Sequence, residues 1–331
     1  MKICVIALNS DFANATINSH AIASMRVSLI AVIILLLSCT LTRSQDKSIL
    51  TDLDSTMSFE DSLSVFNLID SLLSLEGDGA QLAIRVGYNS NVLSAGRTLG
   101  IENFGLSPGV SYYHPLGFYA DVSGFWSKDF TPEYYLTTLS VGYMHDFAKW
   151  FSIMADYDRY LYAESDLYIP YKNTVSITPV LEFKPITMLI NYSFYFGDTH
   201  VHRIMPGLSG RIQKKKWAGL DRVSFSPAVY MLLGNEIITE INYPYGPIEE
   251  RIRQRRGLPW YEQIDRNVFG IMNYTLSAPL SIMYRKWTFT FTYNYNIPKA
   301  LPGESITYGE SSYLSGSLSY FIDLKRNKLS L

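Results

Sequence analysis

Three residues with metal-ligand chemistry occur at every second position in one short segment. They are Asp198, His200 and His202 of the sequence DTHVH. On an extended strand such residues share one face, and a carboxylate with two imidazoles is a set that binds zinc. The competing interpretation is a solvated turn, which we favour because the segment falls in an expected loop. We therefore predict no metal site and no cofactor, with these three residues as the only metal candidates.

Catalytic motifs are scarce in the sequence. It contains no HExxH and no repeated CxxC, and its GxSxG match, GLSPG at 105–109, falls within an expected strand rather than at a strand-to-helix turn. His114 and His145 fall at expected turns, and both cysteines, Cys4 and Cys39, precede Ser44. A chain that begins after Ser44 would have no thiol chemistry. We expect a protein that is not an enzyme, and keep a lipid-modifying barrel enzyme with a Ser/His centre as the last alternative.

Charged residues of both signs recur on the polar face of the expected strands. They are Arg85, Asp121, Asp156, Asp158, Glu182, Arg203, Arg211 and Arg222. If the alternation holds, all of them line one interior, where charges are usually paired. One interpretation is a salt-bridge network that only stabilises the fold. The other is a polar path for a small solute.

The elements that would position these charges are long strands of period two. In WTFTFTYNYN, residues 287–296, aromatic residues take every second position and small polar residues fill the gaps. Such a strand has one apolar and one polar face. Twelve such runs are predicted, near 80–90, 103–113, 117–127, 134–145, 150–161, 173–184, 186–197, 203–213, 221–233, 267–278, 286–297 and 311–323. Most exceed the five or six residues that are usual in globular proteins and match the roughly 9–11 that cross a membrane.

Composition narrows the class of protein. Charged residues make up 18% of the 331 residues, below the roughly 25% of soluble domains, and aromatic residues make up 14%. The net charge of −2 gives no reason to expect a nucleic-acid partner. No apolar run reaches the roughly 18 residues of a membrane-spanning helix.

Connector lengths decide where the apolar faces point. Short connectors are expected at 114–117, 146–149, 184–185, 214–219 and 279–285, and they alternate with mostly longer ones at 91–102, 128–133, 162–172, 198–202, 234–266 and 298–310. This alternation and an even strand count are typical of transmembrane barrels. We therefore predict an all-β fold, a transmembrane antiparallel up-and-down barrel of about twelve strands over residues 80–323. A soluble barrel or sandwich with an aromatic core is the competing interpretation.

Aromatic residues near the expected strand ends fit the membrane interpretation. Tyr112, Trp126, Tyr143, Trp150 and Trp287 would form two interfacial girdles. The aromatic face would then contact lipid, and the Thr/Asn face would line the lumen.

The segments that flank the barrel have their own signals. Residues 1–44 read as an upstream extension followed by a signal peptide whose true start is Met25, with a lipoprotein box at Cys39 as the rival interpretation. Residues 45–79 form a periplasmic segment with an amphipathic helix at about 59–75. Residues 324–331 form a short periplasmic tail. Within the 234–266 loop, PIEERIRQRRG (247–257) predicts a short basic helix with Pro in its first turn.

Two long stretches resemble one family. LAIRVGYNSNVLSAGRTLGIENFGLSPGVSYYHPLGFYADVSGFW (82–126) is similar to an opening of outer-membrane β-barrel proteins from Bacteroidetes-type bacteria, and NYTLSAPLSIMYRKWTFTFTYNYNIPKALPGE (273–304) resembles their closing hairpin. The resemblance implies a barrel in the outer membrane of a Gram-negative cell, and carries no activity. One departure is that KRNKLSL follows the last strand, so the assembly signal would be internal, near Tyr320 and Phe321.

The functional expectation follows from these features. We expect an outer-membrane, porin-like barrel that acts as a narrow channel or transporter for small polar solutes, with both termini in the periplasm. The alternative is a plugged structural or surface-display barrel that binds partners through its outer loops. Expected partners are outer-membrane lipid, the barrel-assembly machinery and a small polar solute.

Overall fold

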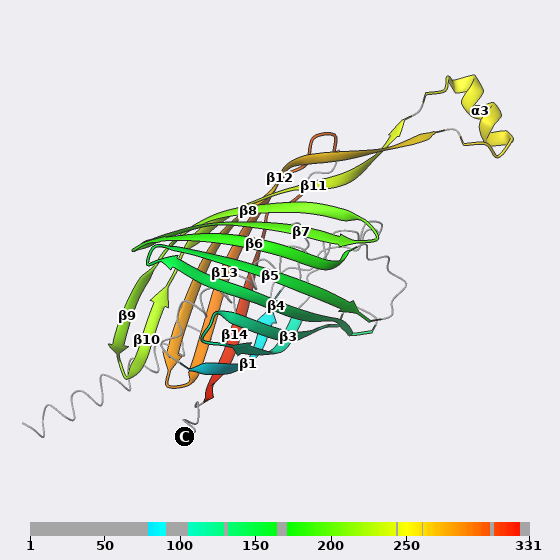
Figure 1. The fold of residues 1–331 in the computed structure, drawn as a ribbon. Coiled ribbons are helices and arrows are strands. Elements are labelled where there is room, and N and C mark those ends of the chain that lie inside the picture. The colour runs from blue at the N-terminus through cyan, green and yellow to red at the C-terminus, as the bar shows by residue number, and fades with distance from the viewer. Residues whose placement is uncertain are drawn as a thin grey trace, which may run out of the picture. The chain divides into compact units, whose positions relative to one another are not determined.

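The strands of the chain close into one antiparallel β-barrel. The computed structural model describes residues 79–90, 105–128, 132–163, 171–242, 244–259, 261–304 and 308–324. These residues contain fourteen strand segments, and apart from the short hairpin of β9 (Ile212–Trp217) and β10 (Leu220–Phe225) twelve strands form a closed barrel, which confirms the predicted fold class (Figure 1). The expected signal peptide, Cys39, the helix at 59–75 and nearly all of the tail lie outside the described residues.

The described elements follow in chain order. The strands are β1 (Ala80–Asn89), β2 (Gly105–Tyr113), β3 (Phe118–Ser127), β4 (Tyr134–Ala148), β5 (Phe151–Tyr162), β6 (Tyr171–Phe183), β7 (Ile186–Gly197), β8 (His200–Gly210), β9 (Ile212–Trp217), β10 (Leu220–Phe225), β11 (Ala228–Asn242), β12 (Glu262–Tyr284), β13 (Trp287–Pro298) and β14 (Ser311–Leu324). The helix α3 (Pro247–Arg255) lies between β11 and β12. Among the described residues no helix is long and apolar enough to cross a membrane.

Pairing between the first and last strands closes the barrel. β1 pairs with β14 along its whole length, from Ala80 opposite Leu324 to Asn89 opposite Ser315. Sequential strands pair antiparallel around the wall, and β11 completes the circle by pairing with both β8 and β12. A closed ladder leaves no strand edge in the wall, so backbone donors and acceptors are paired there.

The two rims of the barrel differ. Ala80 lies opposite Leu324, so both ends of the barrel chain meet at one rim, which we call the terminal rim. The strands meet there through connectors at 114–117, 149–150, 184–185, 218–219 and 285–286. At the opposite, distal rim the connectors are mostly longer, as predicted. The expected longer connector at 198–202 is wrong, because only Asp198 and Thr199 separate β7 from β8.

The predicted short connectors at 214–219 and 279–285 are also wrong in extent. Residues 212–225 form the hairpin of β9 and β10, with its turn at Ala218 and Gly219 in left-handed backbone conformations, and β12 continues to Tyr284. Pro279 has no N–H to donate, yet the strand tolerates it. The reason is its position in a gap between two pairings on that side of β12. β11 pairs with β12 only up to Ser277, and β10 pairs with β12 only from Leu280 onward.

The expected 234–266 loop is mostly secondary structure. β11 runs on to Asn242 and β12 begins at Glu262, and the two strands pair beyond the point where β8 ends its contact at Gly234. We call this extension, residues 235–269, the distal arm. α3 lies at its tip (Figure 1). Pro247 opens this helix, with acidic residues in the first turn and basic residues in the last, as the helix dipole favours.

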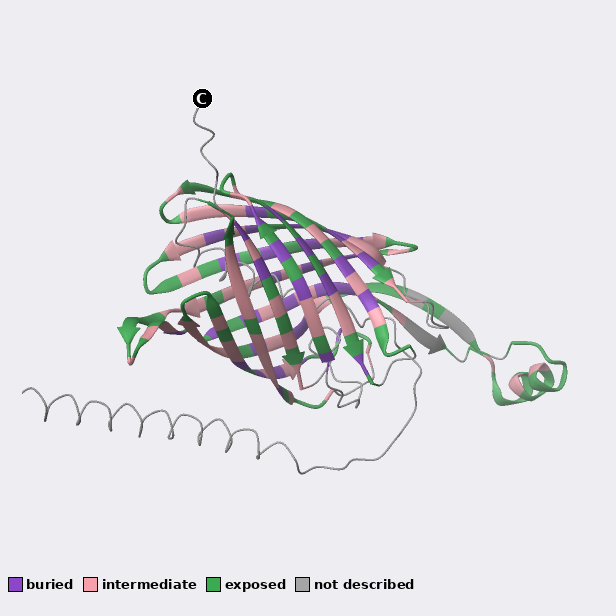
Figure 2. Ribbon diagram, turned by 90° about the horizontal axis from the view of Figure 1, so that it is seen from below, coloured by how far each residue is buried: buried purple, intermediate pink, exposed green. Residues whose placement is uncertain are grey.

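Buried and exposed side chains alternate along the strands, but here the polar side chains are buried and the apolar ones exposed, the reverse of a soluble protein. In Figure 2 buried and exposed residues alternate along the strands. Thr178 and Ser193 face inward with 0% and 2% exposure, whereas the neighbouring Ile177 and Ile190 face outward at 45% and 52%. The interior is therefore rich in hydroxyl and amide groups, and the outer surface is apolar.

Candidate functional site

An ion pair surrounded by hydroxyl groups lies inside the wall formed by β1, β2 and β3. Arg85 Nη1 lies 2.6 Å from Asp121 Oδ2, and Arg85 Nη2 donates to Asp121 Oδ1 at 2.7 Å. Ser111 and Ser123 each accept from the guanidinium and donate to the carboxylate. The Asp121 side chain is 7% exposed and that of Arg85 is 23% exposed, so the carboxylate is buried, and both serine hydroxyls bond to both charges.

A glycine lets Arg85 lie against the wall. A Cβ atom built on Gly109, which lies opposite Arg85 in the β1–β2 ladder, would come within 3.1 Å of Arg85 Nε. The missing side chain leaves a path along which the guanidinium crosses β2 to reach β3. The sequence predicted the inward charges but gave no sign of this path.

A second pair of carboxylates stands on β5 without such support. Asp156 and Asp158 point inward and are 5% and 8% exposed. Among the described residues neither carboxylate oxygen of Asp156 has a hydrogen-bond partner within 3.5 Å, although Ser176 is its hydroxyl neighbour, and no Lys, Arg or His forms an ion pair with either aspartate. The structure therefore does not bring these two residues to a basic partner.

A third charged cluster marks the place where the distal arm leaves the barrel. Arg203 on β8 is 2% exposed, and its Nη2 donates to Glu236 Oε2 at 3.1 Å. Its Nη1 donates to the carbonyl oxygen of Asn235 at 2.6 Å and contacts Met272 Sδ at 3.0 Å. Glu236 was missed because it fell in the expected loop, although it continues the inward parity of Leu232 and Gly234.

Asn235 closes the ladder at the same place. β8 stops pairing with β11 at Arg203, so the backbone N–H of His202 has no strand partner there. Asn235 Oδ1 accepts that N–H at 2.6 Å, and Asn235 Nδ2 donates to Asn267 Oδ1 at 3.1 Å. A side-chain amide thus replaces the backbone carbonyl that the departing strand removes.

The remaining predicted lumen charges lie toward the terminal rim. Glu182 is half-buried near the end of β6, and its backbone N–H donates to the carbonyl oxygen of Trp150. Arg211 lies between β8 and β9, and Arg222 shares the β10 face of the buried Ser224. These three residues are not brought together with the acidic pair on β5.

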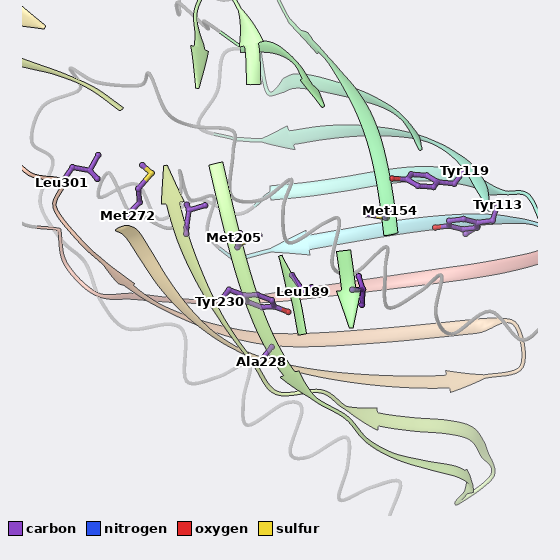
Figure 3. Close-up of a cluster of buried hydrophobic side chains, with 12 residues drawn as sticks. Tyr113, Tyr119, Met154, Leu189, Met205, Ala228, Tyr230, Met272 and Leu301 are labelled. Carbon is purple, nitrogen blue, oxygen red and sulfur yellow. The ribbon is translucent and has the colours of Figure 1, made fainter. Parts of the chain in front are cut away.

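Apolar side chains gather inside the barrel next to the connector between β13 and β14. Leu301, from the connector between β13 and β14, is 2% exposed and belongs to one buried cluster with Met205, Leu232 and Met272 (Figure 3). Leu301 also passes so close to Gly270 that a Cβ there would lie 2.9 Å from its Cδ2. The connector therefore folds inward and adds an apolar side chain to a buried apolar cluster that lies among the polar groups of the interior.

Neutral polar groups cover the wall formed by β12 and β13. Asn273 Nδ2 donates to Asn296 Oδ1 at 3.1 Å and to Thr275 Oγ1 at 2.9 Å, and all three residues are at most 1% exposed. Asn273 Oδ1, Asn296 Nδ2 and Asn294 Oδ1 have no hydrogen-bond partner. This wall offers both donors and acceptors but no charge.

The metal candidates are not arranged as a metal site. His200 and His202 lie on the outward face of β8, and His202 Nδ1 lies 2.8 Å from the Tyr192 hydroxyl. Asp198 instead pairs with Lys172 at 3.2 Å. Among the described residues no group of three or more His, Cys, Asp or Glu side chains is placed to hold a metal ion.

Aromatic residues are exposed near both rims. Tyr112, Tyr143, Trp150 and Trp287 lie toward the terminal rim and Trp126 toward the distal rim, all with 37% to 51% exposure. His145 stacks on Tyr143 with 6.0 Å between ring centroids, and His202 packs against Phe194 at 4.9 Å. The described histidines of β4 and β8 thus belong to the aromatic outer surface.

Known proteins resemble the chain only in shape. No protein-family model matches the sequence, and no curated protein matches it. A structure titled KdgM porin aligns with 72% of this chain and 98% of its own, at 8% identity and a TM-score of 0.40. The NanC porin aligns with 74% of this chain and 100% of its own, at 11% identity and 0.37. LpxR from Salmonella typhimurium aligns with 73% and 100%, at 11% identity and 0.36. Matches with TM-scores of 0.40 or less carry no functional information, and the barrel is defined by its own strand pairing.

Proposed function

We propose that the chain is an outer-membrane β-barrel that acts as a narrow channel for small polar solutes. The observation that carries the proposal is the inverted distribution of polarity. Large apolar side chains such as Val86, Val122 and Ile190 are at least 50% exposed on the outside, while Thr178 and Asn273 are fully buried inside. In water this outer surface would be unstable, whereas in lipid it is the favoured arrangement.

The shape of the barrel supports an outer-membrane orientation. Short turns and both ends of the barrel chain share the terminal rim, and mostly longer connectors lie at the distal rim. Transmembrane barrels place short turns in the periplasm. We therefore propose a periplasmic terminal rim and a distal arm that faces the outside of the cell.

The interior supports passage of small polar molecules more than of large ones. Hydroxyl, amide and charged groups line it, but most inward side chains are buried and Leu301 adds an apolar side chain to the interior. A wide water-filled pore would leave such side chains exposed. We do not propose catalysis. His114 lies in the turn between β2 and β3, and His145, His200 and His202 lie on the outer face of the barrel.

Two measurements test the proposal. When membranes of cells that express the full-length protein are extracted with carbonate, the protein should remain in the membrane pellet. After purification and reconstitution into planar bilayers it should give discrete ion currents. A chain that is recovered from the soluble fraction would overturn the membrane location. A chain that inserts but never conducts would favour the alternative of a plugged display barrel, for which the exposed α3 at the tip of the distal arm provides a surface.

A further inference from the structure

The acidic pair on β5 lacks the compensation that every other buried charge cluster of the described barrel has. Asp121 has Arg85 and two serine hydroxyls, and Glu236 has Arg203. Among the described residues Asp156 and Asp158 have no basic partner, and neither oxygen of Asp156 has a hydrogen bond within 3.5 Å although the residue is 5% exposed. The hydroxyls of Ser176 and Ser140 are the polar neighbours of Asp156 and Asp158, respectively. Two buried carboxylates without a compensating positive charge are costly, so a positive charge from outside the chain would be stabilising there.

Neighbouring basic residues are directed elsewhere. Asp156, Ser176, Ser193 and Arg203 follow one another across adjacent strands. Three interstrand spacings of about 4.8 Å put the backbones of Asp156 and Arg203 about 14 Å apart. The Arg203 guanidinium points the other way, onto Asn235 and Glu236. Arg85 is likewise occupied by Asp121 and the two serines.

The groups around the pair offer oxygen atoms. Asp156 lies opposite Ser176 and Asp158 opposite Thr174 on β6, while Asp158 lies opposite Ser140 on β4. Tyr119 reaches over Gly142, the residue opposite Asp156, so closely that a Cβ there would lie 2.5 Å from the Tyr119 hydroxyl. Carboxylate and hydroxyl oxygens are the ligands of hard cations.

We infer that Asp156 and Asp158 form a binding site for a hard divalent cation that keeps part of its water shell. The charge of the pair matches a divalent ion. The described residues supply no third carboxylate or imidazole at metal-binding distance, so their charged side chains alone do not complete a coordination sphere. Mg²⁺ is typically held in this way, by one or two carboxylates and several waters. Binding needs no open pore, so the inference goes beyond the proposed channel activity and can fail separately from it.

The test measures thermal unfolding of the full chain in detergent, with EDTA or with millimolar Mg²⁺. Mg²⁺ should raise the unfolding midpoint of the wild type in a saturable way, because a ligand that binds only the folded state stabilises it. NaCl at matched ionic strength should produce less than half of that shift. The double variant Asp156→Asn/Asp158→Asn should show no Mg²⁺ shift and, in EDTA, should unfold at a higher temperature than the wild type.

Asp121→Asn is the matched control. It also removes one inward carboxylate, but one that is already paired with Arg85. This variant should unfold at a lower temperature in EDTA and keep the full Mg²⁺ shift. If the double variant does not fold, Mn²⁺ binding to the wild-type chain is measured instead by electron paramagnetic resonance. The expected result is saturable binding of one Mn²⁺ per chain.

Three outcomes would overturn the inference. They are no Mg²⁺ shift in the wild type, an equal shift in the double variant, and lower stability of the double variant in EDTA. The last would mean that the carboxylates are stabilised within the folded chain, for example as protonated groups. A protein that binds Mg²⁺ but gives no currents would retain this site and lose the channel proposal.

Discussion

Arg203 lies directly over Gly234 of the neighbouring strand, and a Cβ atom at Gly234 would come within 2.4 Å of Arg203 Nη1. The same Cβ would lie 2.6 Å from Arg203 Cδ and 3.0 Å from the backbone carbonyl oxygen of His202. The absence of a side chain at Gly234 is what allows the buried guanidinium to reach Asn235 and Glu236.

Gly234→Ala should therefore lower the free energy of unfolding by about 1–3 kcal/mol, because the added methyl group displaces a buried, hydrogen-bonded charge. Denaturant unfolding followed by tryptophan fluorescence would measure it. Gly316→Ala on β14 is the control, since nothing lies within 4 Å of a Cβ there. Equal losses in the two variants would contradict the role of the Arg203 contact.

Asn235→Ala should destabilise the barrel by about 1–3 kcal/mol, because it leaves the His202 backbone N–H without its 2.6 Å acceptor. Asn267→Ala removes only the more exposed partner of the same amide and should cost less. Hydrogen exchange at the His202 amide, measured by mass spectrometry of the β8 peptide, provides a local reading. Unchanged protection of that peptide in Asn235→Ala would rule out the proposed capping.

Replacing Phe291 with Arg should destabilise the membrane-inserted barrel by about 2–4 kcal/mol, because β13 turns this residue toward lipid. Thr290→Arg places the same charge on the inward face, where Thr290 Oγ1 lies 3.3 Å from Ser281 Oγ. This control should lose less stability in unfolding from lipid vesicles. Comparable losses would mean that the face assignment or the environment is wrong.

If the chain conducts as proposed, Asp156→Asn/Asp158→Asn should reduce its cation preference, because two negative charges leave the interior of the barrel. Reversal potentials in asymmetric KCl across planar bilayers measure this preference. Asp121→Asn removes one negative charge and leaves Arg85 unpaired. After correction for this free positive charge, the variant should change the cation preference less than the double variant does. Unaltered selectivity in the double variant would place the ion path away from β5.

If the chain conducts as proposed, Leu301→Ala should raise the single-channel conductance, because it removes a buried apolar side chain that the connector between β13 and β14 places inside the barrel. Leu301→Met keeps nearly the same volume and should conduct like the wild type. Bilayer recordings of the three proteins under one salt condition provide the comparison. A conductance that does not respond to Leu301→Ala would exclude this connector from the narrowest point.

The sequence by itself determined the class of fold. Alternation at residues such as Thr290, Phe291 and Thr292 has a period that only strands can satisfy, and it is a local property that each strand carries alone. Alternating connector lengths then indicated a barrel with distinct rims. The same parity placed Arg85, Asp121, Asp156 and Asp158 on the inward face, where the structure also has them.

Only the tertiary structure decided which of these charges meet. Arg85 and Asp121 lie 36 positions apart and become neighbours because of the strand register and the space over Gly109. Arg203 meets Glu236 because β11 bends out of the wall just after Gly234, a step that ordinary alternation does not encode. Asp156 has no basic partner among the described residues, because the strand order, which depends on pairing between distant segments, leaves three interstrand spacings between it and Arg203. The face to which a side chain points is set by alternation along its own strand, whereas the residue that it meets depends on how the strands pair around the closed barrel.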